Sequence, residues 1–89
     1  MNRLAALEEE IRAEMASSLG RVAERLEGHL AALDRLAAAP RSPEVVAEHR
    51  AVRAHAEKYL WYLIVQREAM GLRDHSRLPY VIPPRLGPA

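Results

Sequence analysis

Cysteine and phenylalanine are both absent from this chain of 89 residues, which also has a single lysine, Lys58, and a single tryptophan, Trp61. Without cysteine the chain forms no disulfide and offers no thiolate as a nucleophile or metal ligand. The lack of disulfides fits the reducing cytoplasm, which is where we expect the protein to be. Because leucine, alanine and valine supply the apolar volume, the composition is typical of a helical protein.

Long hydrophobic runs are also lacking. The longest unbroken apolar run, Tyr59 to Val65, is far shorter than the roughly 20 residues that a membrane-spanning helix needs. The N-terminus becomes acidic at Glu8 and has no basic segment followed by an apolar one, which is the pattern of a signal peptide. We therefore expect neither export nor a membrane partner.

Neither positive nor negative charge dominates the sequence, because the formal net charge is only +1. The two halves differ, since residues 1–40 carry a net charge of −2 and residues 41–89 carry +3. Opposite charges on two halves suit helices that lie side by side. The basic excess is too small to indicate a nucleic-acid partner, which usually requires a clustered stripe on a strongly basic domain.

The N-terminal part of the chain has helical periodicity. Its apolar residues recur at a spacing close to 3.6, at Leu4, Leu7, Ile11, Met15, Leu19, Val22, Leu26, Leu30, Leu33 and Leu36. We expect one continuous helix over about residues 2–38, with Gly20 and Gly28 making room for bulky neighbours. The alternative is a break at Gly20, which would give a three-helix bundle, since glycine in a helix interior costs about 1 kcal/mol.

A second helix is predicted after a short loop at residues 39–43. Ser42 is a good N-cap and Pro43 suits the first helical position. The helix should run over about residues 43–70 and end at Gly71, which reads as a C-cap. Because the loop is short, the two helices should pack antiparallel, as an all-α hairpin within a single domain of residues 1–89.

The second helix ends before it can cover the start of the first. In such a hairpin Leu26 faces Ala56, whereas Leu4, Leu7 and Ile11 find no partner on the second helix. The proline-rich tail, residues 72–89, should be extended and is too apolar to remain free. We expect it to fold back over this N-terminal overhang, in its own subunit or in a partner.

No motif in the sequence carries specific chemistry. The Glu-x-x-His pairs of a di-iron bundle are absent, although His29 and His49 lie on inward faces of their helices. Neither Walker loops nor dinucleotide glycine patterns occur. The run Asp74-His75-Ser76 contains the three residue types of a catalytic triad, but a catalytic triad is defined by the spatial arrangement of its side chains and not by adjacency in sequence. We therefore assign no catalytic, metal or cofactor residue, and the enzyme hypothesis is the weaker one.

Arg67 is the most informative charge, because the phase of the second helix places it on the packed side. A buried guanidinium needs an acidic partner or a bound anion. We expect an internal ion pair with Glu14 or Glu8 on the first helix. The alternative is an anion site that Arg67 forms together with Arg12 and Arg73.

The middle of the second helix is apolar nearly all round, and such a helix must be covered on more than one side. Trp61, Tyr62, Ile64 and Val65 point away from the first helix or lie at its margin. We expect them to form the interface of a homodimer that is a four-helix bundle. A first helix broken at Gly20 could cover the same residues in a monomer.

The segment from Trp61 to His75 includes the run Gln-Arg-Glu-Ala-Met-Gly-Leu-Arg-Asp. It resembles a block in small bacterial all-helical proteins of uncharacterised function, in which a tryptophan and a Gln-Arg-Glu-Ala-x-Gly-Leu-Arg-Asp run close the last long helix. The resemblance implies a shared domain but no activity, because that family has none assigned.

The sequence thus favours a homo-oligomeric interaction or regulatory module. The alternative is a dimeric helical-bundle enzyme or anion-binding protein with an architecture like that of chorismate mutase. In that case Arg67 and nearby arginines would grip an anionic substrate. This analogy concerns architecture alone.

Overall fold

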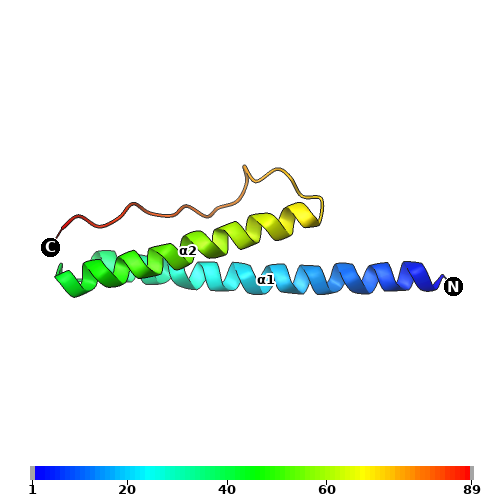
Figure 1. Cartoon of the computed structure of the whole chain (residues 1–89), viewed down its shortest axis with the longest axis horizontal. Helices are drawn as coiled ribbons and strands as arrows, with labels where there is room; N and C mark the ends of the chain where they lie inside the picture. The colour runs from blue at the N-terminus through cyan, green and yellow to red at the C-terminus, as the bar shows by residue number, and fades with distance from the viewer. Residues whose placement is uncertain (1, 89) are drawn as a thin grey trace.

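The computed structural model describes residues 2–88 and contains two helices joined by a short loop. Helix α1 spans Arg3–Ala38 and helix α2 spans Pro43–Ala69, and the two lie antiparallel (Figure 1). The molecule is elongated, with extents of 63 × 20 × 15 Å. The predicted all-α antiparallel hairpin is therefore confirmed, while Ala89 of the predicted tail lies outside the described residues.

Both helices begin at a side-chain cap. The Asn2 carboxamide oxygen accepts a hydrogen bond from the Leu4 N–H at 3.0 Å, and the Ser42 hydroxyl oxygen accepts one from the Val45 N–H at 3.1 Å. Each cap satisfies an N–H that the first helical turn leaves without a partner. Pro43 occupies the start of α2, where its missing N–H costs nothing.

Helix α2 ends in a left-handed turn at Gly71, which has a φ of 85°. The Leu72 N–H donates to the Arg67 carbonyl and the Gly71 N–H donates to the Glu68 carbonyl, both at 2.9 Å. These bonds satisfy carbonyls that the last turn would otherwise leave free. Glycine adopts a positive φ without steric cost, so it allows the left-handed turn through which the chain reverses direction here.

The core lies between the two helices and consists of Leu26, Leu33, Ala56 and Leu63, each at most 3% exposed. The half-buried apolar residues around it are Leu19, Val22, Ala23, Leu30, Val52, Tyr59, Leu60, Leu78, Tyr80 and Ile82. Helix α1 runs through Gly20 without a break, since the apolar residues on both sides of it keep the same phase. Within residues 2–88, no helix is long and apolar enough to cross a membrane.

The packing role predicted for Gly20 and Gly28 is wrong. Both residues are exposed, and a Cβ atom added to either one would meet no neighbouring heavy atom within 4 Å. Neither glycine therefore allows a close approach of other atoms. Nothing in the structure explains why these positions lack a side chain.

The tail after Gly71 runs back along the hairpin toward the interhelix loop, and its end lies beside that loop (Figure 1). Leu78, Tyr80 and Ile82 pack against the core from this segment. The tail points toward the loop because the left-handed turn at Gly71 reverses the chain. It therefore moves away from the N-terminal end of α1.

The N-terminal part of α1 consequently has no cover within its own chain. It projects beyond the end of α2 (Figure 1), and Leu4, Leu7 and Ile11 are 60%, 52% and 47% exposed. The expectation that the tail covers this overhang in its own subunit is wrong. We call these three side chains the overhang ridge.

Side chains of the tail alternate between the core and the solvent. Leu78, Tyr80 and Ile82 point inward, whereas Val81 is 79% exposed. The helices offer few backbone acceptors to such a segment, because their carbonyls bond within the helix. Prolines suit the tail for this reason, since each removes an N–H that would need a partner.

Polar contacts fix the register of the tail. The Tyr80 hydroxyl donates to the Glu27 carboxylate at 2.7 Å, and the Arg53 Nε donates to the Pro83 carbonyl at 2.8 Å. Near the loop, Arg41 donates to the carbonyl of Gly87 at 3.3 Å. These three anchors connect the tail to α1, to α2 and to the loop between them.

We predict that Ile82→Ala lowers the free energy of unfolding by about 1–3 kcal/mol, because it removes part-buried apolar volume from the core surface. Val81→Ala is the matched control, and its effect should stay within about 0.5 kcal/mol since the side chain is exposed. Chemical denaturation measures both. Equal effects of the two substitutions would mean that the tail does not stabilise the hairpin.

Candidate functional site

The tail covers one face of the hairpin and leaves the opposite face open. Glu27 and Arg53 contact the tail, whereas His29 and His55 contact each other, with ring centroids 5.5 Å apart. On each helix these positions are two residues apart, which is about 200° of rotation. The histidines therefore lie on the side away from the tail, which we call the tail-free face.

Aromatic rings and cations gather on the tail-free face. The ring of His29 lies 5.3 Å from that of Tyr59, and Tyr59 meets Tyr62 edge to face at 5.7 Å. The Arg25 guanidinium lies 5.9 Å from the Tyr59 ring, and the Lys58 ammonium lies 5.7 Å from the Tyr62 ring. Arg25 also donates a hydrogen bond to the Tyr59 hydroxyl at 3.2 Å. Both cations thus interact with neutral rings.

The pKa of His29 is lowered from its ordinary value of 6.5. Burial contributes most to this shift, because it disfavours the charged imidazolium, and the nearby charges of His55 and Arg25 act in the same direction. The folded state therefore favours the neutral form of His29.

A hollow opens on the tail-free face where α2 ends. It has a volume of about 240 Å³ and is lined by Met15, Ser18, Gln66, Ala69 and Met70. The Ser18 hydroxyl donates to the Gln66 carboxamide oxygen at 3.4 Å. We call this feature the end hollow. Its lining is mostly apolar, and it lies just beyond Leu63, the last buried core residue of α2.

The overhang ridge and the end hollow belong to the same face of α1. Leu4, Ile11 and Ser18 follow at intervals of seven residues, which repeat on one side of a helix, and Leu7 lies between the first two. Arg25 continues this series onto the aromatic cluster. The tail-free face therefore extends from the aromatic cluster through the end hollow to the overhang.

The predicted interface residues of α2 differ in their exposure. Trp61 is 60% exposed, and Val65, one helical turn further along α2, is also exposed. Leu72 is exposed as well, but it follows the left-handed turn at Gly71 and is not part of the helix. Tyr62 and Ile64 are half-buried. Trp61 and Val65 thus point to solvent, while the other two predicted residues lie at the edges of this exposed surface.

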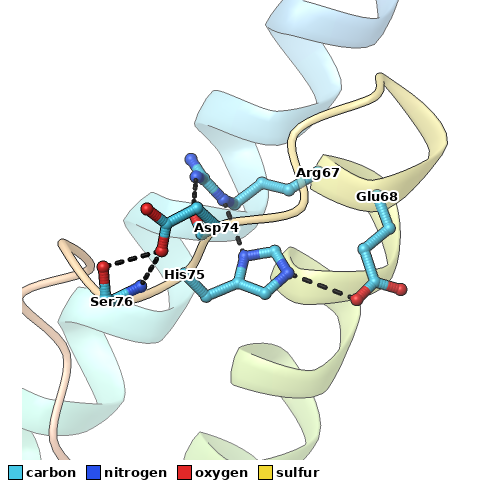
Figure 2. A network of polar contacts seen from close by, with 5 residues as sticks. All are labelled: Arg67, Glu68, Asp74, His75 and Ser76. Atoms are coloured by element: carbon cyan, nitrogen blue, oxygen red, sulfur yellow. Dashed lines mark hydrogen bonds and ion pairs between the residues drawn. The ribbon is translucent and has the colours of Figure 1, made fainter.

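Arg67 organises the turn that follows α2 (Figure 2). Its Nε donates to His75 Nδ1 at 3.2 Å, and its Nη2 donates to the Asp74 carbonyl at 3.0 Å. On the other side of the imidazole, His75 Nε2 lies 3.3 Å from a Glu68 carboxylate oxygen. The predicted pair with a glutamate of α1 is not what the structure contains, because the tail returns over Arg67 and supplies acceptors nearer to it.

The other residues predicted to act with Arg67 make separate contacts. Arg12 lies on the exposed overhang and pairs with Glu8 and Glu9 at 3.8 and 3.4 Å. Arg73 is exposed. Glu14 lines a shallow hollow on α1 together with Met15, Ser17, Ser18 and Arg21. In residues 2–88, the contacts of Arg12 and the surroundings of Glu14 thus do not join these residues to Arg67 in one anion site.

Asp74, His75 and Ser76 do not form a catalytic triad. The Ser76 hydroxyl donates to the Asp74 carboxylate at 2.6 Å, and the imidazole of His75 turns toward Arg67 and Glu68 instead (Figure 2). Hydrogen bonds from the Ser76 side chain and backbone lower the pKa of Asp74. The three residues close a turn, and a nucleophile would need His75 beside Ser76.

The histidines are distributed over several environments. His49 is buried in the core, and within residues 2–88 no group of three or more histidine, cysteine, aspartate or glutamate side chains could hold a metal. Sequence reasoning missed the pairing of His29 with His55. The sequence feature that could have indicated this pairing is the spacing of His55, Tyr59 and Tyr62, because residues three and four positions apart lie on one side of a helix.

We predict that Arg67→Met lowers the free energy of unfolding by about 1–3 kcal/mol, because two hydrogen bonds to the turn are lost at about 0.5–1.5 kcal/mol each. Arg73→Met removes the same charge from an exposed position and should change stability by less than about 0.5 kcal/mol. Urea denaturation compares the two. Matching small effects would show that Arg67 does not hold the turn.

We predict that stability falls on acidification below about pH 6.5 and that His29 contributes to the fall. The folded pKa of His29 lies below its ordinary value, so the unfolded chain takes up the proton first. The contribution is complete above the unfolded pKa and is lost as pH falls through the folded one. His29→Gln should reduce the difference between thermal midpoints at about pH 8 and about pH 5. An unchanged difference would contradict the prediction.

No curated protein and no solved structure matches the chain significantly. A family of unknown function, DUF6665, matches it over residues 2–84, which include both helices and most of the tail. This match covers the segment from Trp61 to His75 and brings no activity with it. The chain therefore belongs to the DUF6665 family.

Proposed function

We propose that this protein is a homodimeric interaction module in which the outer side of α2 packs against the same side of a second copy. The exposure of Trp61 carries the proposal, since 60% of this large side chain is open to solvent. Val65 extends the exposed apolar surface by one turn of α2. Monomeric proteins seldom leave a contiguous apolar patch of this kind uncovered.

The surroundings of Trp61 suit an interface. Its ring lies 5.5 Å from Tyr62, which contacts Tyr59 at the edge of the core. An anchor held by its neighbours loses less conformational entropy on binding than a free side chain does. Tryptophan and tyrosine are also the residues that most often dominate interface energies. A two-fold axis would need only this one self-complementary surface.

The contacts of the arginines favour a module over an enzyme. An enzyme that binds an anionic substrate through arginines needs several of them to converge on one pocket. Here Arg67 holds a turn and Arg12 pairs with glutamates of its own helix. The proposal therefore assigns the protein no reaction, and it places the dimer in the cytoplasm on the basis of the cysteine-free sequence.

Light scattering at tens of micromolar should give a mass near twice the 10.0 kDa of the chain. We expect Trp61→Glu to shift the equilibrium to monomer, because it places a charge in a desolvated contact. Ala51→Glu is the matched control, since Ala51 is an exposed residue of α2 nearer the loop. This variant should keep the mass of the wild type.

Circular dichroism on the same samples separates loss of assembly from loss of fold. Helical Trp61→Glu monomers beside dimeric wild type and Ala51→Glu would support the proposal. A wild-type chain that remains a 10.0 kDa monomer at these concentrations would refute it.

A further inference from the structure

We propose that the end of the molecule beside the interhelix loop binds a small organic anion, whose carboxylate or phosphate group is held by arginines and whose body rests on apolar walls. The site is a hollow of about 310 Å³ between α1, α2 and the returning tail. We call it the loop hollow. Its lining residues are Leu33, Asp34, Ala37, Arg41, His49, Pro83, Pro84, Arg85, Leu86 and Gly87. All of them belong to one chain, so the inference does not rest on the proposed dimer.

His49 is the residue that points to a ligand. It is only 1% exposed, yet the side-chain hydrogen bonds around it, which Arg41, Ser42 and Arg53 make, do not include its ring. No side-chain nitrogen or oxygen of residues 2–88 is both fully buried and without a hydrogen-bond partner. A ring nitrogen of His49 therefore remains accessible from the loop hollow or from the smaller hollow that His49 also lines. An imidazole can donate an N–H to a ligand there whether it is neutral or protonated.

Three arginines lie around this histidine. Arg41 and Arg85 line the loop hollow, while Arg50 and Arg85 line the smaller hollow, which has a volume of about 30 Å³. In the described part of the chain, none of the three forms an ion pair with a carboxylate. A guanidinium presents a planar fork of N–H donors that matches the oxygens of a carboxylate or a phosphate. The arginines thus offer the charge and the geometry that an anion needs.

The tail holds Arg85 in place at this site. Two residues before it, the Pro83 carbonyl accepts a hydrogen bond from the Arg53 Nε at 2.8 Å. Two residues after it, the Gly87 carbonyl accepts one from the Arg41 Nη1 at 3.3 Å. The tail therefore runs beside the loop with its backbone anchored on both sides of Arg85 (Figure 1). Such an arrangement lowers the entropy that the tail loses when a ligand binds.

The apolar walls suit the body of an organic anion. Leu33 extends the core into the hollow, and Pro83, Pro84 and Leu86 of the tail lie across from it. Small-molecule sites have mostly apolar linings with a few convergent polar groups, and their volumes begin at about 300 Å³. A cavity of about 150 Å³ already accommodates benzene. The loop hollow is therefore large enough for one ring that carries a charged group. We assign it binding and no reaction.

Isothermal titration calorimetry can test the site with benzoate, phenyl phosphate and phenol. The three compounds share one ring, and only the first two carry an anionic group. We expect both anions to bind, and we expect phenol to bind about tenfold or more weakly because it leaves the arginines without a charged partner. The tighter of the two anions shows whether the site prefers a carboxylate or a phosphate.

Substitutions locate the charge of the ligand. Arg85→Met should raise the dissociation constant of the tighter anion about tenfold or more, because it removes a charge-assisted hydrogen bond. Arg73→Met is the matched control. Arg73 is equally exposed but follows the turn at Gly71, at the opposite end of α2, so its effect should stay below about twofold. Asp34→Asn should lower the dissociation constant, because it removes a negative charge from the lining.

Nuclear magnetic resonance reports the position of the ligand. The ring signals of His49 should shift during the titration, whereas those of His75, which contacts Arg67 at the opposite end of α2, should not. Circular dichroism verifies that each variant keeps the helical fold, as expected for substitutions of exposed residues.

Four results would each overturn the proposal. Absence of binding by either anion below about 10 mM would remove the site. Equal affinity for phenol would mean that the hollow selects apolar surface and not charge. Equal losses in Arg85→Met and Arg73→Met would indicate attraction by the net charge of the chain. Unchanged His49 signals in the presence of a bound anion would place that anion elsewhere.

Discussion

The reversal of the chain at Gly71 determines which surfaces of this hairpin are covered. A left-handed residue at the end of α2 sends the tail back along the helices, where Leu78 and Ile82 complete the core. Arg67 holds the start of this return through His75 and the Asp74 carbonyl. Had the chain continued in the direction of α2, the same apolar residues would have reached the overhang instead. The open faces of the molecule are therefore a consequence of one turn.

Much of the fold follows from local rules that the sequence displays. The helical phase from Leu4 onward, the cap at Ser42 and the glycine after α2 each act over a few residues, so they indicated where the helices begin and end. The hairpin followed because its loop is short. Gly20 shows the limit of the same reasoning, because the register placed it opposite a bulky residue while the structure leaves it facing solvent.

The path of the tail could not be predicted, because its inward and outward residues alternate in a way that fits any apolar groove. Its direction depends on the turn at Gly71 and on anchors far away in sequence, such as Glu27 for Tyr80 and Arg53 for Pro83. The contacts that Arg67 makes to His75 and to the Asp74 carbonyl depend on that path, so they could not be predicted either. The exposure of Trp61 was predictable, since it required only the phase of α2.

The covered and open faces divide the apolar surface of the chain between two kinds of contact. On the tail side, the chain closes its own core, and this closure is independent of concentration. On the tail-free face, the overhang ridge and the end hollow remain open at one end of the molecule. Folding completes the first contact, and the proposed association with a second copy would bury apolar surface that remains open. Association depends on protein concentration by mass action. At low concentration the chain would therefore remain a folded monomeric hairpin with its overhang exposed. A helix longer than its partner thus gives a small protein a surface that only another molecule can cover.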